Sequence, residues 1–233
     1  SPSGITEVEK RAVRDSAEHA GAKEVYMIHE PMAAAIGMGI DVEEPMGNMI
    51  IDIGGGTSEI AVIALGGIVC DKSTRIAGDD FNANIEEYMR RQHNILIGER
   101  SAEQVKIEVG AAMTEIENPP ADYAVQGRDL MSGIPKEVFV SYVEIAHCLD
   151  KSISKIEEAI LNAREITPPE CAADIYRTGI YMAGGGSLLR GLDKRISLKT
   201  KLPVHVCEDP LRAVARGTGI ALNNVQKFPF LIK

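Results

Sequence analysis

The sequence has few cysteines, and they are widely spaced along the chain. They are Cys70, Cys148, Cys171 and Cys207. No two of them stand at the short spacing that holds zinc, and they are too few for a disulfide framework. We therefore expect reduced thiols in the core of a cytoplasmic protein.

Long apolar runs and clusters of basic residues are missing as well. No apolar run approaches the roughly 20 residues of a membrane span, and no charged-then-apolar signal peptide opens the chain. The net charge is −9, with acidic and basic residues interleaved. Affinity for nucleic acids depends mainly on clustered lysines and arginines. We therefore expect no nucleic-acid partner, which leaves small mobile ligands.

The sequence does have enough apolar residues, 45%, for a globular core. Its 233 residues allow one large domain or two modest ones. No internal repeat and no low-complexity linker interrupts the chain.

The most informative stretch runs from residue 48 to residue 64. It consists of an apolar segment, Asp52, the glycines Gly54–Gly56 and a second apolar segment. The first segment predicts a buried strand, and the alternation in the second predicts a half-buried strand, so that the glycines close a hairpin. A dinucleotide fold and a P-loop both run from glycines into a helix, and the lysine of a P-loop is absent here.

Three residues without a Cβ let backbone N–H groups converge on an anion, such as the terminal phosphates of a nucleotide. At Gly55 and Gly56 we expect φ values that only glycine adopts readily. Asp52, at the end of the first strand, would face the phosphates and could hold a hydrated Mg²⁺. A glycine hairpin with an exposed aspartate explains the same pattern equally well.

Two helices precede this stretch. Thr6 and Glu9 have the spacing of a capping box and predict a helix from Glu7 to Ala20, followed by a strand over 24–28. The second helix begins at Glu30-Pro31 and has small residues on nearly every face to Gly39. We interpret it as a tightly packed hinge, with an ordinary buried helix as the alternative.

Hydrophobic periodicity and turn residues predict the remaining elements. Strands are predicted over 67–76, 113–117, 123–131, 137–141, 179–183 and 203–207. Helices are predicted after Gly78, over 101–110, from Leu149 to Ala163, from Leu188 to Ile196 and from Asp209 to about 225. The result is an α/β core into which residues 79–144 are inserted as a small α+β lobe.

Two further features suggest a ligand but have plain alternatives. The glycines Gly184–Gly186 lead from a strand into a helix, which suits a phosphate or a flat ring against main chain, or is a simple turn. Glu103 and Lys106 lie on the same side of a helix, where they would form a solvated ion pair if no ligand binds there.

Together, the two glycine turns and the Glu-Pro hinge helix resemble the superfamily of actin, sugar kinase and heat-shock chaperone ATPases. Within it, essentially the whole chain resembles the MreB family of rod-shape-determining bacterial actins. The segments that carry the resemblance are 28–37, 52–57, 125–130 with 133–135, 184–189 and 208–217. Residues 125–135 lie outside the shared nucleotide machinery, so they favour this family over the chaperones.

The resemblance implies an actin-like ATPase (ribonuclease H-like) fold that uses ATP or ADP and Mg²⁺. Residues 48–78 and 145–209 would form the second large subdomain, essentially complete, with 79–144 as the inserted small subdomain. Residues 1–47 and 210–233 would form a truncated first domain.

The resemblance also implies roles for individual residues. Asp52 would position Mg²⁺ through water, and Glu30 would orient the attacking water, as base or as anchor. The second phosphate loop would be Gly54, Gly55, Gly56 and Thr57. The border of ribose and base would be Glu103, Gln104, Val105 and Lys106. The loop on the adenine side would be Gly184, Gly185, Gly186, Ser187 and Leu188.

One part of the family pattern is missing, because no first phosphate loop of the Asp-Leu-Gly-Thr type precedes Ser1. We therefore expect this chain to be the C-terminal two-thirds of a longer protein and to be inactive by itself. The apolar segment by which the family touches membrane is missing too, so peripheral membrane contact is expected only for the intact protein.

For the intact protein, the resemblance implies a filament-forming, weak ATPase of the bacterial cytoskeleton that controls rod shape and organises cell-wall synthesis. Its partners would be copies of itself and the cell-wall elongation machinery, in the cytoplasm at the inner face of the membrane. The alternatives are a chaperone-type ATPase domain that does not polymerise and a non-catalytic nucleotide-binding scaffold.

Overall fold

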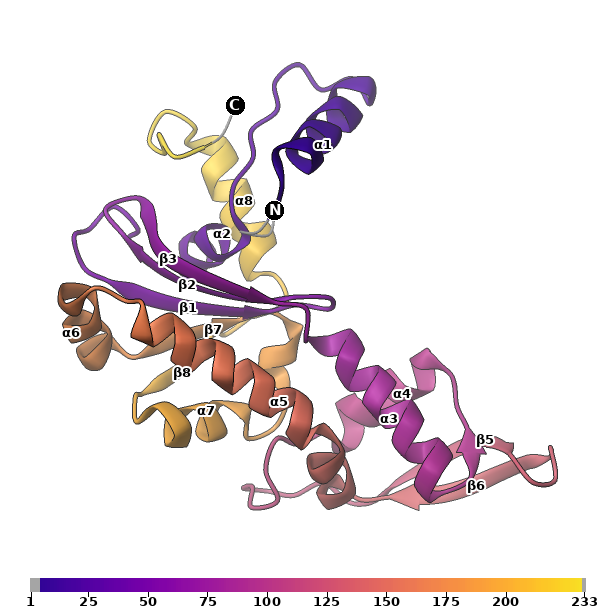
Figure 1. Ribbon diagram of the computed structural model, residues 1–233. Helices are drawn as coiled ribbons and strands as arrows, with labels where there is room; N and C mark the ends of the chain where they lie inside the picture. Colours follow the sequence, from indigo (N-terminus) through magenta and orange to yellow (C-terminus); the bar gives the residue numbers. More distant parts are fainter. Residues whose placement is uncertain (1–4, 232–233) are drawn as a thin grey trace.

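The computed structural model describes residues 5–231 (Figure 1). In this part of the chain the larger sheet has five strands in the order β3-β2-β1-β7-β8. They are β1 (Asn48–Ile53), β2 (Ser58–Ala64), β3 (Gly67–Thr74), β7 (Ile180–Ala183) and β8 (Val204–Val206). The first three form an antiparallel meander, and β7 and β8 run parallel to β1. The predicted glycine hairpin and meander are therefore confirmed.

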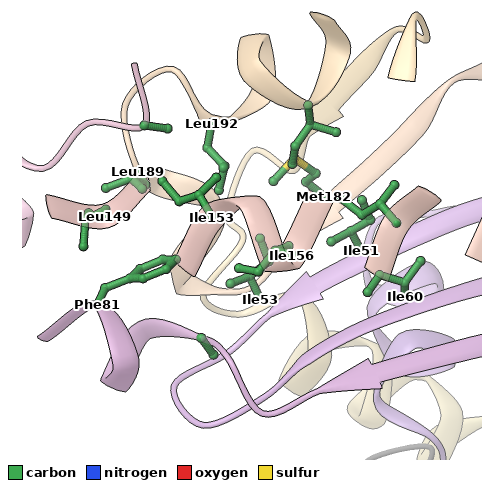
Figure 2. Packing of buried hydrophobic residues seen from close by; sticks show 14 of the residues in the cluster. Ile51, Ile53, Ile60, Phe81, Leu149, Ile153, Ile156, Met182, Leu189 and Leu192 are labelled. Carbon is green, nitrogen blue, oxygen red and sulfur yellow. The ribbon is translucent and has the colours of Figure 1, made fainter. Parts of the chain in front are cut away.

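Helices cover both faces of this sheet. The helix α5 (Tyr142–Glu165) lies on one face, where Ile51, Ile53 and Ile60 pack against its apolar side (Figure 2). On the other face, α2 (Glu30–Gly37) packs against the sheet, and α8 (Ala213–Asn223) packs against α2 (Figure 1). Every residue of β2 is consequently buried, so the prediction of a half-buried strand was wrong.

The helices α2 and α8 are in backbone contact. A Cβ atom at Gly217 would lie 1.8 Å from the Ala33 carbonyl oxygen, and one at Gly37 would lie 1.9 Å from the Ala213 carbonyl oxygen. Only glycine allows two helix backbones to approach so closely. Every residue of α2 after Glu30 is buried, which confirms a slim helix that is packed on all sides.

A smaller antiparallel sheet and two helices lie beside the first sheet (Figure 1). Its strands are β4 (Ile95–Leu96), β5 (Tyr123–Asp129) and β6 (Pro135–Val140), and its helices are α3 (Gly78–Gln92) and α4 (Glu99–Val109). Gly133 supplies the left-handed residue, φ +75°, of the turn between β5 and β6. These elements correspond to the predicted inserted lobe, whereas the division of the chain into domains stays a prediction.

Two predicted strands do not form. Residues 24–28 form no named strand of either sheet, although Met27 is in an isolated bridge. Residues 113–117 have only an isolated bridge beside them, from Ala111 to Arg190. Asn118, with φ +52°, and two prolines then turn the chain away.

Several helix ends also differ from the prediction. The helix α1 (Glu7–His19) has the expected capping box. The helix α5 begins well before Leu149, after a capping box of Ser141 and Glu144. The helix α6 (Pro169–Thr178) was not predicted, although proline is common in the first turn of a helix, where Pro169 stands.

Two predictions from composition, buried thiols and no membrane span, can be compared with the structure. All four cysteines are free, but only Cys171 is buried and the other three are half-buried. Between residues 5 and 231, no helix has the length and apolar character needed to cross a membrane.

Candidate functional site

A cleft of about 630 Å³ opens where the two glycine turns, α2, α3, α4 and the segment before α8 meet. It brings together most of the residues that the sequence singled out. The predicted residues that line it are Glu30, Asp52, Gly54, Gly55, Glu103, Lys106, Gly184, Gly185, Gly186 and Leu188. Predicted residues from four distant parts of the chain thus form one site.

The first glycine turn is held by the N-terminus of α3. The carbonyl oxygens of Gly54 and Gly55 accept hydrogen bonds from the N–H groups of Gly78 (3.1 Å) and Asp79 (2.8 Å). Among residues 5–231, no acceptor is present for the N–H groups of Gly55 and Gly56. Two adjacent donors are therefore available to an anion.

The backbone of this turn is ordinary, contrary to the prediction. Neither Gly55 nor Gly56 has a positive φ, because the hairpin and the bonds to α3 hold the turn in a conformation open to any residue. Small size still matters at Gly55, where a Cβ would lie 3.3 Å from the Asp79 carboxylate.

Asp52 lies at the end of β1 and is only 6% exposed, so the alternative of an exposed aspartate is wrong. Its carboxylate touches the second glycine turn, because a Cβ atom at Gly184 would lie 2.5 Å from Oδ1. Burial raises the pKa of Asp52 to about 6, and the negative charges of Glu30 and Glu59 add to the shift. A nearby cation would favour the ionised carboxylate.

The carboxylate oxygens of Asp52 suit a hard cation that keeps most of its ligands as water molecules. Carboxylate oxygens are the ligands that Mg²⁺ prefers, and Mg²⁺ usually keeps several waters. Between residues 5 and 231, no three His, Cys, Asp or Glu side chains are grouped closely enough to hold a metal ion by themselves. The buried Asp52 carboxylate therefore fits a water-mediated Mg²⁺ better than a direct metal cage.

Lys106 brings a positive charge to the opposite wall. Its Nζ donates a hydrogen bond of 3.0 Å to the Gly78 carbonyl oxygen, beside the first glycine turn. Burial lowers the pKa of Lys106, and the negative charges of Glu103 and Asp79 oppose the shift. Lys106 is thus a half-buried group directed at the turn, rather than one end of a solvated surface pair.

The second glycine turn presents bare main chain to the cleft. Gly184 has φ +81°, and its N–H donates to the Pro210 carbonyl oxygen at 3.0 Å. A Cβ at Gly185 would lie 2.8 Å from Leu211 Cδ2, and one at Gly186 would lie 2.2 Å from Ile53 Cγ2. The turn continues into the short 3₁₀ helix η1 (Gly185–Leu188), and α7 (Leu192–Thr200) begins later than predicted.

Five predicted residues do not line the cleft. They are Gly56, Thr57, Gln104, Val105 and Ser187. Val105 is buried in the core, the Gln104 amide donates to Glu108 at 2.7 Å, and the Ser187 hydroxyl donates to the Gly184 carbonyl oxygen at 2.7 Å. The last two side chains thus stabilise their own segments.

Other residues of the cleft were not predicted as site residues. They are Gly78, Asp79, Phe81, Ile107, Leu189, Pro210, Leu211 and Val214. The sequence marked Gly78-Asp79 and Asp209-Pro210 only as helix starts, and α8 in fact begins at Ala213. The helix-start signals were the available clue, because helix N-termini commonly face anions.

Comparison with known proteins gives consistent matches. A family model described as "MreB/Mbl protein" matches residues 1–229. The cell shape-determining protein Mbl of Bacillus subtilis (strain 168) is 43% identical over 98% of this chain and 68% of its own length. The cell shape-determining protein MreB of Escherichia coli (strain K12) is 47% identical over 96% of this chain and 64% of its own length. The chain thus spans about two thirds of the length of these relatives.

Solved structures agree with these matches. MreB5 of Spiroplasma citri bound to AMPPNP superposes with a TM-score of 0.93 at 41% identity, over 97% of this chain and 67% of that one. The MamK double helical filament has a TM-score of 0.79 at 21% identity, over 96% of this chain and 67% of that one. At that identity the second likeness shows the fold alone.

Proposed function

The chain belongs to the MreB/Mbl family and has an actin-like fold, and from this we propose that it binds ATP and ADP in the cleft and assembles with copies of itself under control of the nucleotide. In the cell the assembly would act as a cytoskeletal filament that determines rod shape. The names of the relatives, cell shape-determining proteins, support this proposal.

The observation that carries the proposal is the pairing of free backbone donors with a buried carboxylate. Gly55 lines the cleft and Gly56 directly follows it, and their N–H groups would bind the terminal phosphates. Lys106 would add positive charge beside the phosphates. Asp52 would hold Mg²⁺ through water, and the ion would neutralise phosphate charge. Phosphoryl transfer requires this positioning and neutralisation more than covalent chemistry.

Glu30 is the proposed group for hydrolysis. It stands at the N-terminus of α2, lines the cleft, and its charge raises the pKa of Asp52. It is thus on the side of the cleft where the phosphates would lie, and it would orient the attacking water as base or as anchor. We propose slow turnover, in which ATP acts mainly as an assembly switch.

The base and ribose would lie at the other end of the cleft. There Glu103 and Ile107 of α4 face Gly184–Gly186 and Leu188. Bare main chain on one wall and an apolar side chain on the other suit a flat ring. Residues Gln104, Val105 and Ser187 would support these walls from behind.

Three parts of the proposal rest on family membership alone. They are cooperation with the cell-wall elongation machinery, location in the cytoplasm at the inner face of the membrane, and peripheral contact with that membrane. Imaging of a fluorescent fusion tests the location, because a uniformly cytoplasmic signal in growing rods would contradict it.

Light scattering of the full-length protein tests the function. We expect ATP with Mg²⁺ to raise the scattering, and Asp52→Asn to abolish the rise. A monodisperse monomer under all nucleotide conditions would instead favour the chaperone-type ATPase. Nucleotide binding without any phosphate release would favour the non-catalytic scaffold.

A further inference from the structure

Two walls enclose the proposed base end of the cleft, and they come from distant parts of the chain. One wall is α4, which contributes Glu103 and Ile107. The other is the second glycine turn with Leu188 and Leu189. The residue that joins the two walls is Arg190, which directly follows Leu189 and is not itself part of the cleft lining.

Arg190 is bonded to the end of α4 through both its side chain and its main chain. Its Nη1 donates to the carbonyl oxygens of Ile107 (2.9 Å) and Gly110 (3.3 Å). Its own carbonyl oxygen accepts a hydrogen bond of 2.8 Å from the Ala112 N–H. Ala111 and Arg190 also form a parallel β-bridge.

The hydrogen bonds from Arg190 are made to the C-terminal end of α4. The helix ends at Val109, and the last carbonyl groups of a helix have no partner within it. A guanidinium at this end satisfies two carbonyl groups and lies at the negative end of the helix dipole. Arg190 therefore caps α4 from another segment of the chain.

The main chain is tightly packed at the same place. A Cβ atom at Gly110 would lie 2.1 Å from the Lys106 carbonyl oxygen and 2.9 Å from Leu189 Cδ1. Leu189 is 7% exposed and lines the cleft. Gly110, at the end of α4, is thus packed directly against Leu189 of the second wall.

We propose that Arg190 is a positioning residue that fixes the distance between the two walls of the cleft, and thereby sets the affinity contributed by the nucleoside part of the nucleotide. It acts through Ile107 and Leu189, which line the cleft. The inference rests on the proposed nucleotide function. It predicts no effect on the phosphate end, because bonds from α3 hold the turn at Gly55, and Lys106 Nζ is held by its hydrogen bond to the Gly78 carbonyl oxygen.

Calorimetry on the full-length protein tests the inference with two probes, ATP and inorganic tripolyphosphate, each with Mg²⁺. Arg190→Met keeps the length of the side chain but removes its donors. We expect it to weaken ATP binding about tenfold, equivalent to about 1.4 kcal/mol, and to leave tripolyphosphate binding unchanged. Arg190→Lys keeps the charge and should restore part of the loss. Lys194→Met is the control, because Lys194 forms an ion pair with Glu117 on the surface.

Hydrogen exchange supplies a readout that does not depend on binding. We expect the amides of residues 107–112 to exchange faster in Arg190→Met than in the wild type or the control. Unchanged ATP affinity, unchanged exchange, or an equal loss for ATP and tripolyphosphate would each overturn the inference. A wild-type protein that binds no ATP would overturn the proposed function as well.

Discussion

Asp52 and Glu59 lie directly opposite each other on the antiparallel strands β1 and β2, and they are only 6% and 1% exposed. Residues opposite each other in such a pair share one face of the sheet, and like charges there destabilise it. The Ser73 hydroxyl donates to Glu59 Oε1 at 2.6 Å, and burial together with the charges of Glu30 and Glu59 raises the pKa of Asp52. Without a cation, the folded protein is thus most stable when Asp52 is protonated.

Replacing Asp52 by asparagine should therefore stabilise the nucleotide-free protein in a pH-dependent way. The pKa of Asp52 is raised from 3.8 to about 6 in the folded state, so the folded state holds the proton more tightly. Stability falls as the pH rises from about 4 to about 6, and the loss of about 3 kcal/mol is complete above that range. Denaturant unfolding should show Asp52→Asn gaining about this much over wild type at pH 7 relative to pH 4.

Magnesium supplies the control for this prediction. Excess Mg²⁺ with ATP should stabilise the wild type at pH 7 and have little effect on Asp52→Asn, which lacks the charge that attracts the ion. A stability difference between the two proteins that does not change with pH would contradict the predicted linkage.

Replacing Gly55 by valine should remove nucleotide binding but leave the fold intact. The backbone there is open to any residue, and the nearest group to a new Cβ is the movable Asp79 side chain at 3.3 Å. The branched side chain would cover the N–H donors of the turn, and two charge-assisted bonds contribute about 1.5 to 3 kcal/mol each. ATP affinity measured by calorimetry should fall by at least about 100-fold.

Gly219→Val is the matched control, because Gly219 lies on α8 with no atom within 4 Å of a new Cβ. Both variants should unfold within about 1 kcal/mol of wild type. Wild-type affinity in Gly55→Val would show that the turn does not bind phosphate.

The elements that the sequence predicted correctly are those fixed by neighbouring residues. The hairpin at Gly54–Gly56 and the capping box of α1 depend on turn and cap chemistry that a short segment contains. The burial of both faces of β2, and the absence of strands over 24–28 and 113–117, depend on which distant segments pack or pair beside them. No local pattern contains that information.

In the candidate site, too, some residues could be predicted from local sequence and others could not. Asp52 and the two glycine turns follow from residue type and spacing. Asp79 and Leu211 enter the cleft only because α3 and the segment before α8 fold against those turns. The loss of the expected φ values at Gly55 has the same origin, since bonds from α3 hold the turn in an ordinary conformation.

Replacing Glu30 by glutamine should separate hydrolysis from binding. Glu30 lines the cleft beside Asp52, where it could hold a water without gripping the nucleotide. Positioned acids and bases contribute about 100-fold to 10,000-fold to rate, so phosphate release should fall by at least about 100-fold with ATP affinity within about threefold of wild type. Glu43→Gln, near Lys227 on the surface, should change neither. Parallel loss of hydrolysis and binding would mean that Glu30 only stabilises the start of α2.

The contact between α2 and α8 gives the last prediction. A methyl group at Gly217 cannot fit 1.8 Å from the Ala33 carbonyl oxygen, so Gly217→Ala must push the helices apart and should destabilise the protein by about 3 kcal/mol or more. Gly219→Ala, two residues along the same helix and in open space, should instead stabilise it by about 0.5 to 1 kcal/mol. Thermal unfolding of the two variants measures both effects. Because Glu30 begins α2, displacement of this helix should also slow ATP hydrolysis in Gly217→Ala. An unchanged hydrolysis rate in a folded Gly217→Ala protein would show that the position of α2 does not control the group that orients the attacking water.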